Sequence, residues 1–239
     1  SIKKAVHKAE KMAGIEIKNV YTGIAGSHIL GFNSKGAVPI KNQEVKMGDI
    51  EKALETARAI AIPPDREILH VIPQEFIIDG QDGIKNPLGI SGVRLEVLVH
   101  IITGAITSAQ NIVKSINKAG LEVMDIVLQP LASSDAVLTQ DERELGVALI
   151  DIGGGTTDLA VFINGAVTHT AVIGIGGNHV TNDIAYGIRT PLAEAERLKI
   201  NHGCALRSLV VENGGMEVQD VGGRPPRLLT RHELAGIIE

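Results

Sequence analysis

Three consecutive glycines stand between two apolar runs in the stretch ALIDIGGGTTDLAVFI, which covers Ala148 to Ile163. On both sides of the glycines, apolar side chains alternate with other residues, as in half-buried β-strands. We therefore expect the segment GGGTT, Gly153 to Thr157, to form the tip of a β-hairpin. This context excludes a Walker A loop, which needs a following helix and a Gly-Lys-Ser or Gly-Lys-Thr ending. The nearby segment GIGGN lacks the third glycine of a dinucleotide-binding loop.

A turn of this composition has the chemistry of an anion site. Successive backbone N–H groups can converge on one phosphate, and glycine permits close approach because it has no side chain. Thr156 and Thr157 add hydroxyl donors, and the Asp151 carboxylate could hold a water bound to Mg²⁺. The alternative is a plain turn, with Asp151 and Asp158 as ordinary strand-end residues. Three glycines give more conformational freedom than a plain hairpin turn needs, but they do not decide the matter alone; together with the flanking residues DI and TTD they favour the phosphate interpretation.

Composition and charge exclude several other classes of protein. The chain has 239 residues and a formal net charge of −5, with no basic cluster suited to nucleic acid. Aromatic residues make up only 2% of the chain and tryptophan is absent, so base-stacking platforms are not expected. The single cysteine, Cys204, excludes an internal disulfide framework, and we expect a cytoplasmic protein. Because the chain starts without methionine in one apparent helix and stops in another, we expect a fragment of a longer protein.

Strand-like and helix-like segments alternate along the chain, which predicts an α/β fold. Residues 25–106 have the pattern of a β-α-β-β unit with a sheet of its own. In its last strand, within residues 92–104, apolar side chains alternate with Arg94, Glu96 and His100. This alternation predicts a half-buried strand with these three polar side chains on the opposite face from the apolar ones.

Other segments give more local predictions. Residues 66–80 predict either a strand pair or one long bent strand, with Pro73 at an edge or bulge. Residues 107–120 predict a helix that ends at its terminal glycine. Pro130 is expected at the first position of a further helix, whereas the polar segment DEREL, residues 141–145, predicts a turn.

Several strings of this sequence resemble a known superfamily. DIGGGTTD is similar to the second phosphate-binding hairpin of the actin, sugar-kinase and chaperone ATPase superfamily. QPLASS, GIGGNHVTNDIA and AEAERLK resemble its water-positioning helix start, its helix-opening glycine loop and its nucleoside-contacting helix. Longer strings resemble the FtsA family of bacterial actin homologues along essentially the whole chain; they are HVIPQEF, GIKNPLGISGVRLEV, DERELGVALIDIGGGTTD, NHGCALRSLV and VGGRPPR.

This resemblance implies an α/β fold with two actin-like (ribonuclease H-like) lobes that close on a nucleotide. Residues 25–106 would be the subdomain that the family inserts, called 1C, and residues 1–24 and 107–133 would be segments of the first lobe. Residues 134–176 would be the nucleotide-binding core of the second lobe. Residues 177–239 would then form its smaller subdomain, in an incomplete form.

The resemblance also implies roles for individual residues. It implies that Gln129 orients a water and that Asp151 is catalytic through water-bound Mg²⁺. It further implies that Glu196 and Lys199 touch the ribose and adenine of ATP. The residues implied to cradle or border the phosphates are Gly153, Gly154, Gly155, Thr156, Thr157, Gly176 and Gly177. From the residues alone, an i, i+3 ion pair is favoured for Glu196 and Lys199, and a polar helix-start role for Gln129.

The function implied by the resemblance is assembly at the division septum. Members of the family bind ATP, form filaments, tether FtsZ filaments to the membrane and recruit later division proteins, for which the inserted subdomain is the expected docking site. The implied location is cytoplasmic and peripheral, on the inner face of the cell membrane, through a C-terminal amphipathic helix that is absent from this chain. The implied enzyme activity is at most a slow ATPase.

Two alternatives from the same superfamily remain open at this point. A small-molecule kinase needs a carboxylate base and a sugar pocket, and a chaperone-like ATPase needs a peptide-binding domain. No motif in the sequence indicates any of these features. The family's first phosphate loop is also missing from the chain. Because phosphoryl chemistry requires the phosphates to be enclosed from several sides, we expect this chain alone to bind ATP weakly and hydrolyse little.

Overall fold

The computed structural model describes the chain in three stretches, residues 2–211, 214–220 and 225–239. The chain divides into two units, of which unit 1 comprises residues 1–151 and 158–173 and unit 2 comprises residues 152–157 and 174–239. The lobe boundaries given above stay a prediction. No helix in the described stretches is long and apolar enough to cross a membrane.

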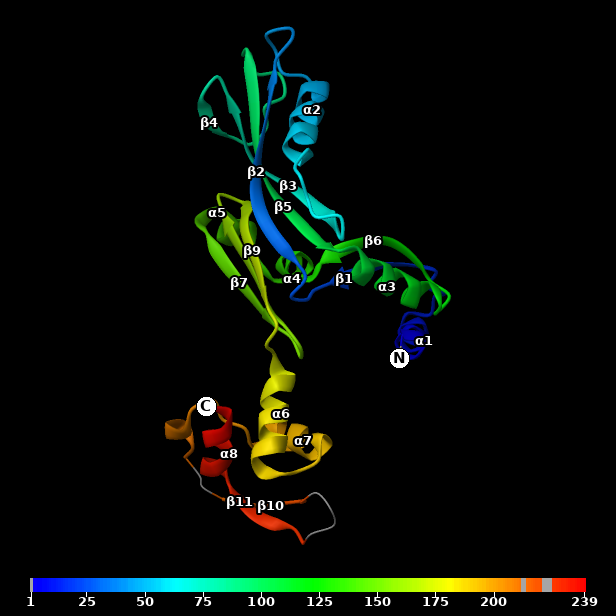
Figure 1. The fold of residues 1–239 in the computed structure, drawn as a ribbon, viewed down its shortest axis with the longest axis vertical. Helices are drawn as coiled ribbons and strands as arrows, with labels where there is room; N and C mark the ends of the chain where they lie inside the picture. Colours follow the sequence, from blue (N-terminus) through cyan, green and yellow to red (C-terminus); the bar gives the residue numbers. More distant parts are fainter. Residues whose placement is uncertain (1, 212–213, 221–224) are drawn as a thin grey trace. The chain divides into compact units, whose positions relative to one another are not determined.

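The first fourteen elements of the fold are strands and helices in mixed order (Figure 1). They are α1 (Ile2–Ala13), β1 (Asn19–Ile24), β2 (Leu30–Pro39), α2 (Met47–Arg58), β3 (Arg66–Ile78), β4 (Gln81–Ile84), β5 (Arg94–Ala105), α3 (Ile106–Asn117), β6 (Glu122–Leu128), α4 (Gln129–Val137), α5 (Gln140–Leu145), β7 (Val147–Ile152), β8 (Thr157–Ile163) and β9 (Ala166–Ile173). Further along the chain come α6 (Gly177–Ile188), α7 (Leu192–His202), the 3-10 turn Arg207–Leu209, β10 (Gly215–Val218), β11 (Arg227–Thr230) and α8 (Arg231–Ile238).

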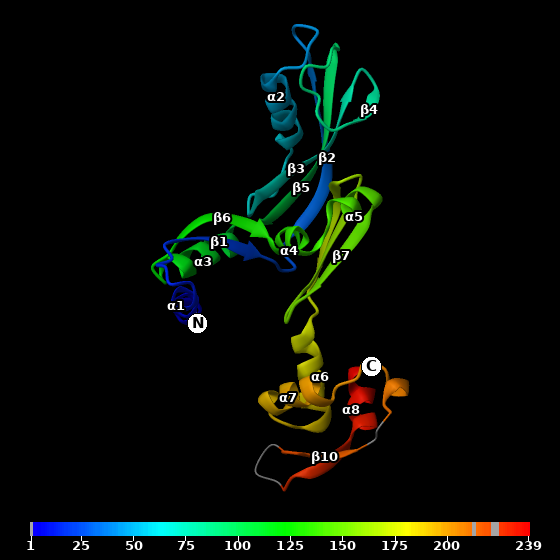
Figure 2. The ribbon, with the colours of Figure 1, turned by 180° about the vertical axis from the view of Figure 1, so that it is seen from behind.

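A four-stranded antiparallel sheet in the order β2-β5-β3-β4 carries α2 along one face (Figure 2). Leu95, Val97 and Val99 of β5 are completely buried in the core that α2 covers, which confirms the predicted alternation. The predicted β-α-β-β unit therefore forms, with the short strand β4 as an addition. β3 is one long strand whose register shifts between Pro73 and Glu75, so the proline lies at a bulge, as its missing N–H requires.

The opposite face of this sheet is partly covered by β9, which lies in a second sheet of order β7-β8-β9. Buried polar contacts join the two sheets within unit 1. His100 of β5 contacts Asn33 Oδ1 through Nδ1 at 2.7 Å and Thr170 Oγ1 of β9 through Nε2 at 2.9 Å. Gln74 donates to the Val167 carbonyl at 2.8 Å and to the same Asn33 oxygen at 3.3 Å. His100, predicted on a polar face, is thus buried, because β9 covers that part of the face.

β1 and β6 form a parallel pair beside α3, and β6 leads directly into α4. The helix predicted over residues 107–120 is α3, and Gly120 follows it at a φ of +92°. That left-handed conformation suits glycine and stops the helix. α4 begins at Gln129, so Pro130 stands at its second position, one residue later than predicted, where the missing N–H of proline is still not needed.

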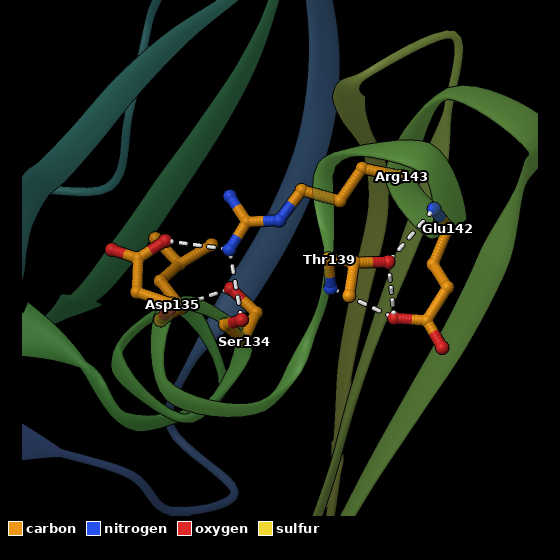
Figure 3. Close-up of polar contacts among 6 residues, drawn as sticks. Ser134, Asp135, Thr139, Glu142 and Arg143 are labelled. Carbon is orange, nitrogen blue, oxygen red and sulfur yellow. Dashed lines mark hydrogen bonds and ion pairs between the residues drawn. The ribbon is translucent and has the colours of Figure 1, made fainter.

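Residues 140–145 form the short helix α5, where the sequence predicted a polar turn. Thr139 caps it, because its hydroxyl accepts the Glu142 N–H at 3.3 Å while the Glu142 carboxylate accepts the Thr139 N–H at 2.8 Å (Figure 3). This reciprocal pair is a capping box, which satisfies backbone donors that a turn would leave to water. The prediction of a turn was wrong because polar composition alone does not distinguish a turn from a short helix that a Thr-x-x-Glu pattern caps.

In unit 2, α6, α7 and α8 pack around a core that includes Ile184, Leu198 and Leu234. β10 and β11 form an antiparallel pair that contributes Val218 to the same core. The last helix begins at a second capping box, in which Thr230 accepts the N–H three residues later. The capping-box spacing read from the sequence therefore marks the true start of α8.

Candidate functional site

The glycine turn joins β7 to β8, which are neighbours in one sheet, so the predicted hairpin is confirmed. The turn itself belongs to unit 2. It is closed by a hydrogen bond from the Gly153 N–H to the Thr156 carbonyl at 2.8 Å. Thr157 anchors its far side by donating its hydroxyl to the Ile175 carbonyl at 2.8 Å. Its three glycines are all exposed, so the backbone of the turn is open to a ligand.

The turn is bonded to the loop that opens α6. The Gly153 carbonyl accepts the Gly177 N–H at 2.9 Å, and the Gly154 carbonyl accepts the Asn178 N–H at 2.7 Å. A Cβ on Gly176 would lie 2.5 Å from the Gly153 oxygen, closer than real Cβ contacts come. Two glycine segments about 20 residues apart thus form one backbone cradle in unit 2, and glycine at 176 is required by their close approach.

Lys199 of α7 reaches the first turn of α6. Its ammonium donates to the Gly177 carbonyl at 3.0 Å and to the Thr181 hydroxyl at 2.8 Å, and pairs with Glu196 at 2.7 Å. The i, i+3 ion pair that the residues alone favoured is therefore present. The Lys199 hydrogen bond, followed by one from Thr181, holds the pKa of the Glu196 carboxyl below its usual range. A closed ion pair of opposite charges consequently lies beside the glycine cradle.

Thr181 was not among the predicted site residues, although it joins the Lys199 and Glu196 contacts. Its spacing from Gly177 is the signal that could have found it. Residues four apart on a helix share a face, so the fourth residue after a helix-opening glycine lies beside that glycine's carbonyl. The Thr181 hydroxyl oxygen indeed lies 3.1 Å from the Gly177 carbonyl oxygen, while its one proton is donated to the closer Glu196 carboxylate.

Gln129 belongs to unit 1, where it forms the first residue of α4 and is exposed. It lies against Gly23 of β1, where a Cβ would come within 2.8 Å of the Gln129 Cγ. The residue before it, Leu128, donates its N–H to Nε2 of His70 at 3.0 Å. Burial lowers the pKa of His70, so its ring stays neutral and can accept this bond. The start of α4 is therefore fixed to β3.

Asp151, also in unit 1, lies near the end of β7 and is half-buried. One of its carboxylate oxygens, Oδ2, accepts a hydrogen bond from the Ser133 hydroxyl of α4 at 2.6 Å. Ser133 was quoted in the sequence motif but assigned no role there. The contact joins residues 18 apart in the chain, which local sequence spacing does not reveal.

The site residues fit a magnesium nucleotide in two respects, the binding of its phosphates and the binding of its Mg²⁺. The backbone of the three exposed glycines of the turn, packed against the buried Gly176, leaves room for phosphate oxygens to approach closely. Mg²⁺ prefers oxygen ligands, keeps several waters and needs only one or two carboxylates, so Asp151 fits a water-mediated contact. Within residues 2–211, 214–220 and 225–239, no three His, Cys, Asp or Glu side chains are placed to hold a metal together.

Comparison with known proteins gives two family matches. Residues 26–103 match the model of the SHS2 domain inserted in FtsA, and residues 148–237 match the model of cell division protein FtsA. The whole chain is 52% identical to cell division protein FtsA of Pseudomonas aeruginosa and, over 238 residues, 50% identical to that of Escherichia coli K12. The chain spans about 57% of the length of these two relatives.

Among solved structures, this chain resembles the PilM-PilN type IV pilus biogenesis complex with a TM-score of 0.59 at 18% identity. The likeness covers 83% of this chain and 55% of that one. A weaker likeness, with a TM-score of 0.46 at 23% identity, is to MreB5 of Spiroplasma citri bound to ADP, over 56% of this chain and 43% of that one. The PilM likeness and the family matches confirm the predicted fold class, an actin-like α/β fold with an inserted subdomain.

Proposed function

Because the chain belongs to the FtsA family of bacterial cell-division proteins, we propose that it binds ATP and Mg²⁺ and assembles at the division septum. The observation that supports nucleotide binding is the cradle that the glycine turn forms with the first residues of α6. The exposed backbone of its glycine turn, which has no side chains, gives phosphate oxygens the close approach that they require.

In this proposal each predicted site residue has one task. The glycines and threonines of the cradle bind the β- and γ-phosphates, while Glu196 and Lys199 contact the ribose and adenine, for which their ion pair has to open. Gln129 orients a water for slow hydrolysis, and Asp151 holds a water of the Mg²⁺ shell. Bound Mg²⁺ supplies charge neutralisation at the phosphates. Nucleotide turnover then serves as a switch for assembly.

The proposed partners follow from the family. They are FtsZ, later division proteins docking on the inserted subdomain, and further copies of the protein in a filament. Attachment to the inner face of the cell membrane is proposed to use an amphipathic helix outside this chain. The direct test is sedimentation of the complete protein on lipid vesicles with and without ATP and FtsZ. We expect ATP-dependent pelleting of the protein, and we expect FtsZ to pellet with it. If the protein does not pellet with ATP and FtsZ does not pellet with it, the proposal is overturned.

Substitution of Gly155 by alanine tests the phosphate cradle inside this chain. An added Cβ at Gly155 has no atom within 4 Å, so stability should change by less than about 0.5 kcal/mol. The same Cβ projects from the exposed turn, so we expect ATP affinity to fall about tenfold, which is about 1.4 kcal/mol. NMR titration with ATP measures this, because it reaches the weak affinity expected here.

The matched control is Gly214→Ala, since Gly214 lies in the same unit and its added Cβ also meets open space. This variant should bind ATP as the native chain does. Equal ATP affinity of the Gly155→Ala variant and the native chain would contradict phosphate binding at the turn.

A further inference from the structure

The hydrogen bond between Ser133 and Asp151 links the helix that starts at Gln129 to the strand that leads into the glycine turn. The Ser133 hydroxyl donates to Oδ2 of Asp151 at 2.6 Å, and both side chains are half-buried. A short bond from a hydroxyl to a carboxylate is charge-assisted and therefore stronger than a neutral one. The contact is built from two elements of unit 1 and does not depend on any ligand.

Ser133 is held in place from both ends of α4. At the start, the Leu128 N–H is bonded to His70. At the other end, one nitrogen of the Arg143 guanidinium donates to the Ser134 carbonyl and pairs with Asp135, both at 2.8 Å (Figure 3). The same guanidinium lies 5.3 Å from the centre of the Phe162 ring of β8. α4 is thus bonded to β3 at its start and to α5 in its second half, which fixes the backbone that carries Ser133.

An aspartate carboxylate has two equivalent oxygens and a broad χ2 preference, so it does not orient itself. The hydrogen bond from Ser133 occupies Oδ2 and fixes both the χ1 rotamer of Asp151 and the plane of its carboxylate. Oδ1 is then the oxygen that can accept from a water in the Mg²⁺ shell. Partners that orient metal-associated carboxylates in this way affect metal affinity about 10–100-fold.

We propose that Ser133 is a positioning residue for Asp151, which it orients toward the water shell of nucleotide-bound Mg²⁺. This inference rests on the proposed function, because it assumes that Mg²⁺-ATP binds. In this proposal, Ser133 itself does not contact the nucleotide. Removal of the Ser133 hydroxyl should therefore weaken only the part of ATP binding that depends on Mg²⁺.

The first test compares ATP binding in Mg²⁺ and in EDTA by NMR titration of the native chain and the Ser133→Ala variant. The measured quantity is the Mg²⁺ gain, the ratio of the ATP affinity in Mg²⁺ to that in EDTA. We expect this ratio to be about tenfold smaller in the variant, with the ATP affinity in EDTA unchanged. Ser133→Thr keeps a hydroxyl and should restore the gain. Ser134→Ala is the matched control, because that neighbouring hydroxyl donates within α4 to the Leu131 carbonyl at 2.6 Å. A full Mg²⁺ gain in Ser133→Ala would overturn the proposal.

The second test needs no nucleotide. Three-bond couplings to the Asp151 carboxyl carbon report its χ1 rotamer, which should be single in the native chain and averaged in Ser133→Ala. An unchanged rotamer in that variant would overturn the positioning role. If the native chain binds no ATP in either buffer, the proposed function fails, while the couplings still decide whether Ser133 orients Asp151.

Discussion

Replacement of Gly36 by alanine should lower the free energy of unfolding of unit 1 by more than about 3 kcal/mol, beyond the usual range for overpacking a core. Gly36 is a buried residue of β2 that α2 crosses closely. An added Cβ would lie 2.1 Å from the Ala53 carbonyl oxygen and 2.6 Å from the Ala57 nitrogen. Both are backbone atoms of α2, so no side chain can turn away to make room. The helix has to separate from the sheet, which exposes the core beneath it.

Urea unfolding followed by circular dichroism measures this loss. The matched control is Gly48→Ala, in the first turn of α2, where an added Cβ meets no atom within 4 Å. Alanine there should be neutral or stabilising by up to about 1 kcal/mol, because alanine favours the helix. A Gly36→Ala variant within about 1 kcal/mol of the native chain would show that α2 does not pack on β2 in this way.

The second large effect is a loss of stability in acid that comes from His100. This side chain is 1% exposed, and its burial, with a smaller contribution from the charge of His169, lowers its pKa to about 4. The Asn33 oxygen also accepts from Gln74, so His100 donates its Nδ1 proton to Asn33 and accepts from the Thr170 hydroxyl. The neutral ring makes both bonds without bringing a charge into the buried site, so burial favours it over the protonated ring.

The sign of the pH effect follows from the two pKa values. In the unfolded chain His100 titrates near its ordinary pKa of about 6.5, whereas the folded chain resists protonation until about pH 4. Its contribution to stability is complete above pH 6.5 and is lost as the pH falls toward 4. The shift corresponds to about 3 kcal/mol at most.

Urea unfolding at pH 7, 5.5 and 4 tests this, with a His100→Gln variant as the reference. Carboxylates titrate in both proteins, so the difference between the two pH dependences isolates His100. We expect the native chain to lose about 3 kcal/mol more than the variant between pH 7 and 4. Parallel curves would mean that His100 takes up its proton in the folded state without a penalty.

Features that depend on local sequence could be predicted. The glycine turn, the stop of α3 at Gly120 and the cap of α8 at Thr230 follow from backbone conformations and hydrogen bonds that a few neighbouring residues determine. The cap of α5 at Thr139 has the same kind of local signal, whereas the polar composition of residues 141–145 is equally typical of a turn.

Features that depend on contacts between distant segments could not be predicted. Alternation placed His100 on the polar side of β5 correctly, but it carries no information about β9, which covers that position. Ser133 likewise gains its partner from a strand that follows a separate helix. The predicted pairing of Glu196 with Lys199 succeeded because both residues lie on one helix.

The division of the chain into units has a consequence for how this protein can be cut or recombined. Unit 2 is assembled from two separate stretches, residues 152–157 and 174–239, with β9 and the part of β8 after Thr157 assigned to unit 1. A protease cut or a gene fusion point before Gly174 would leave α6 without the carbonyls of Gly153 and Gly154 that bind its first N–H groups. A segment that keeps α6 bonded to the glycine turn must therefore also contain β8 and β9. For this reason, neither unit can be excised or replaced as one continuous segment.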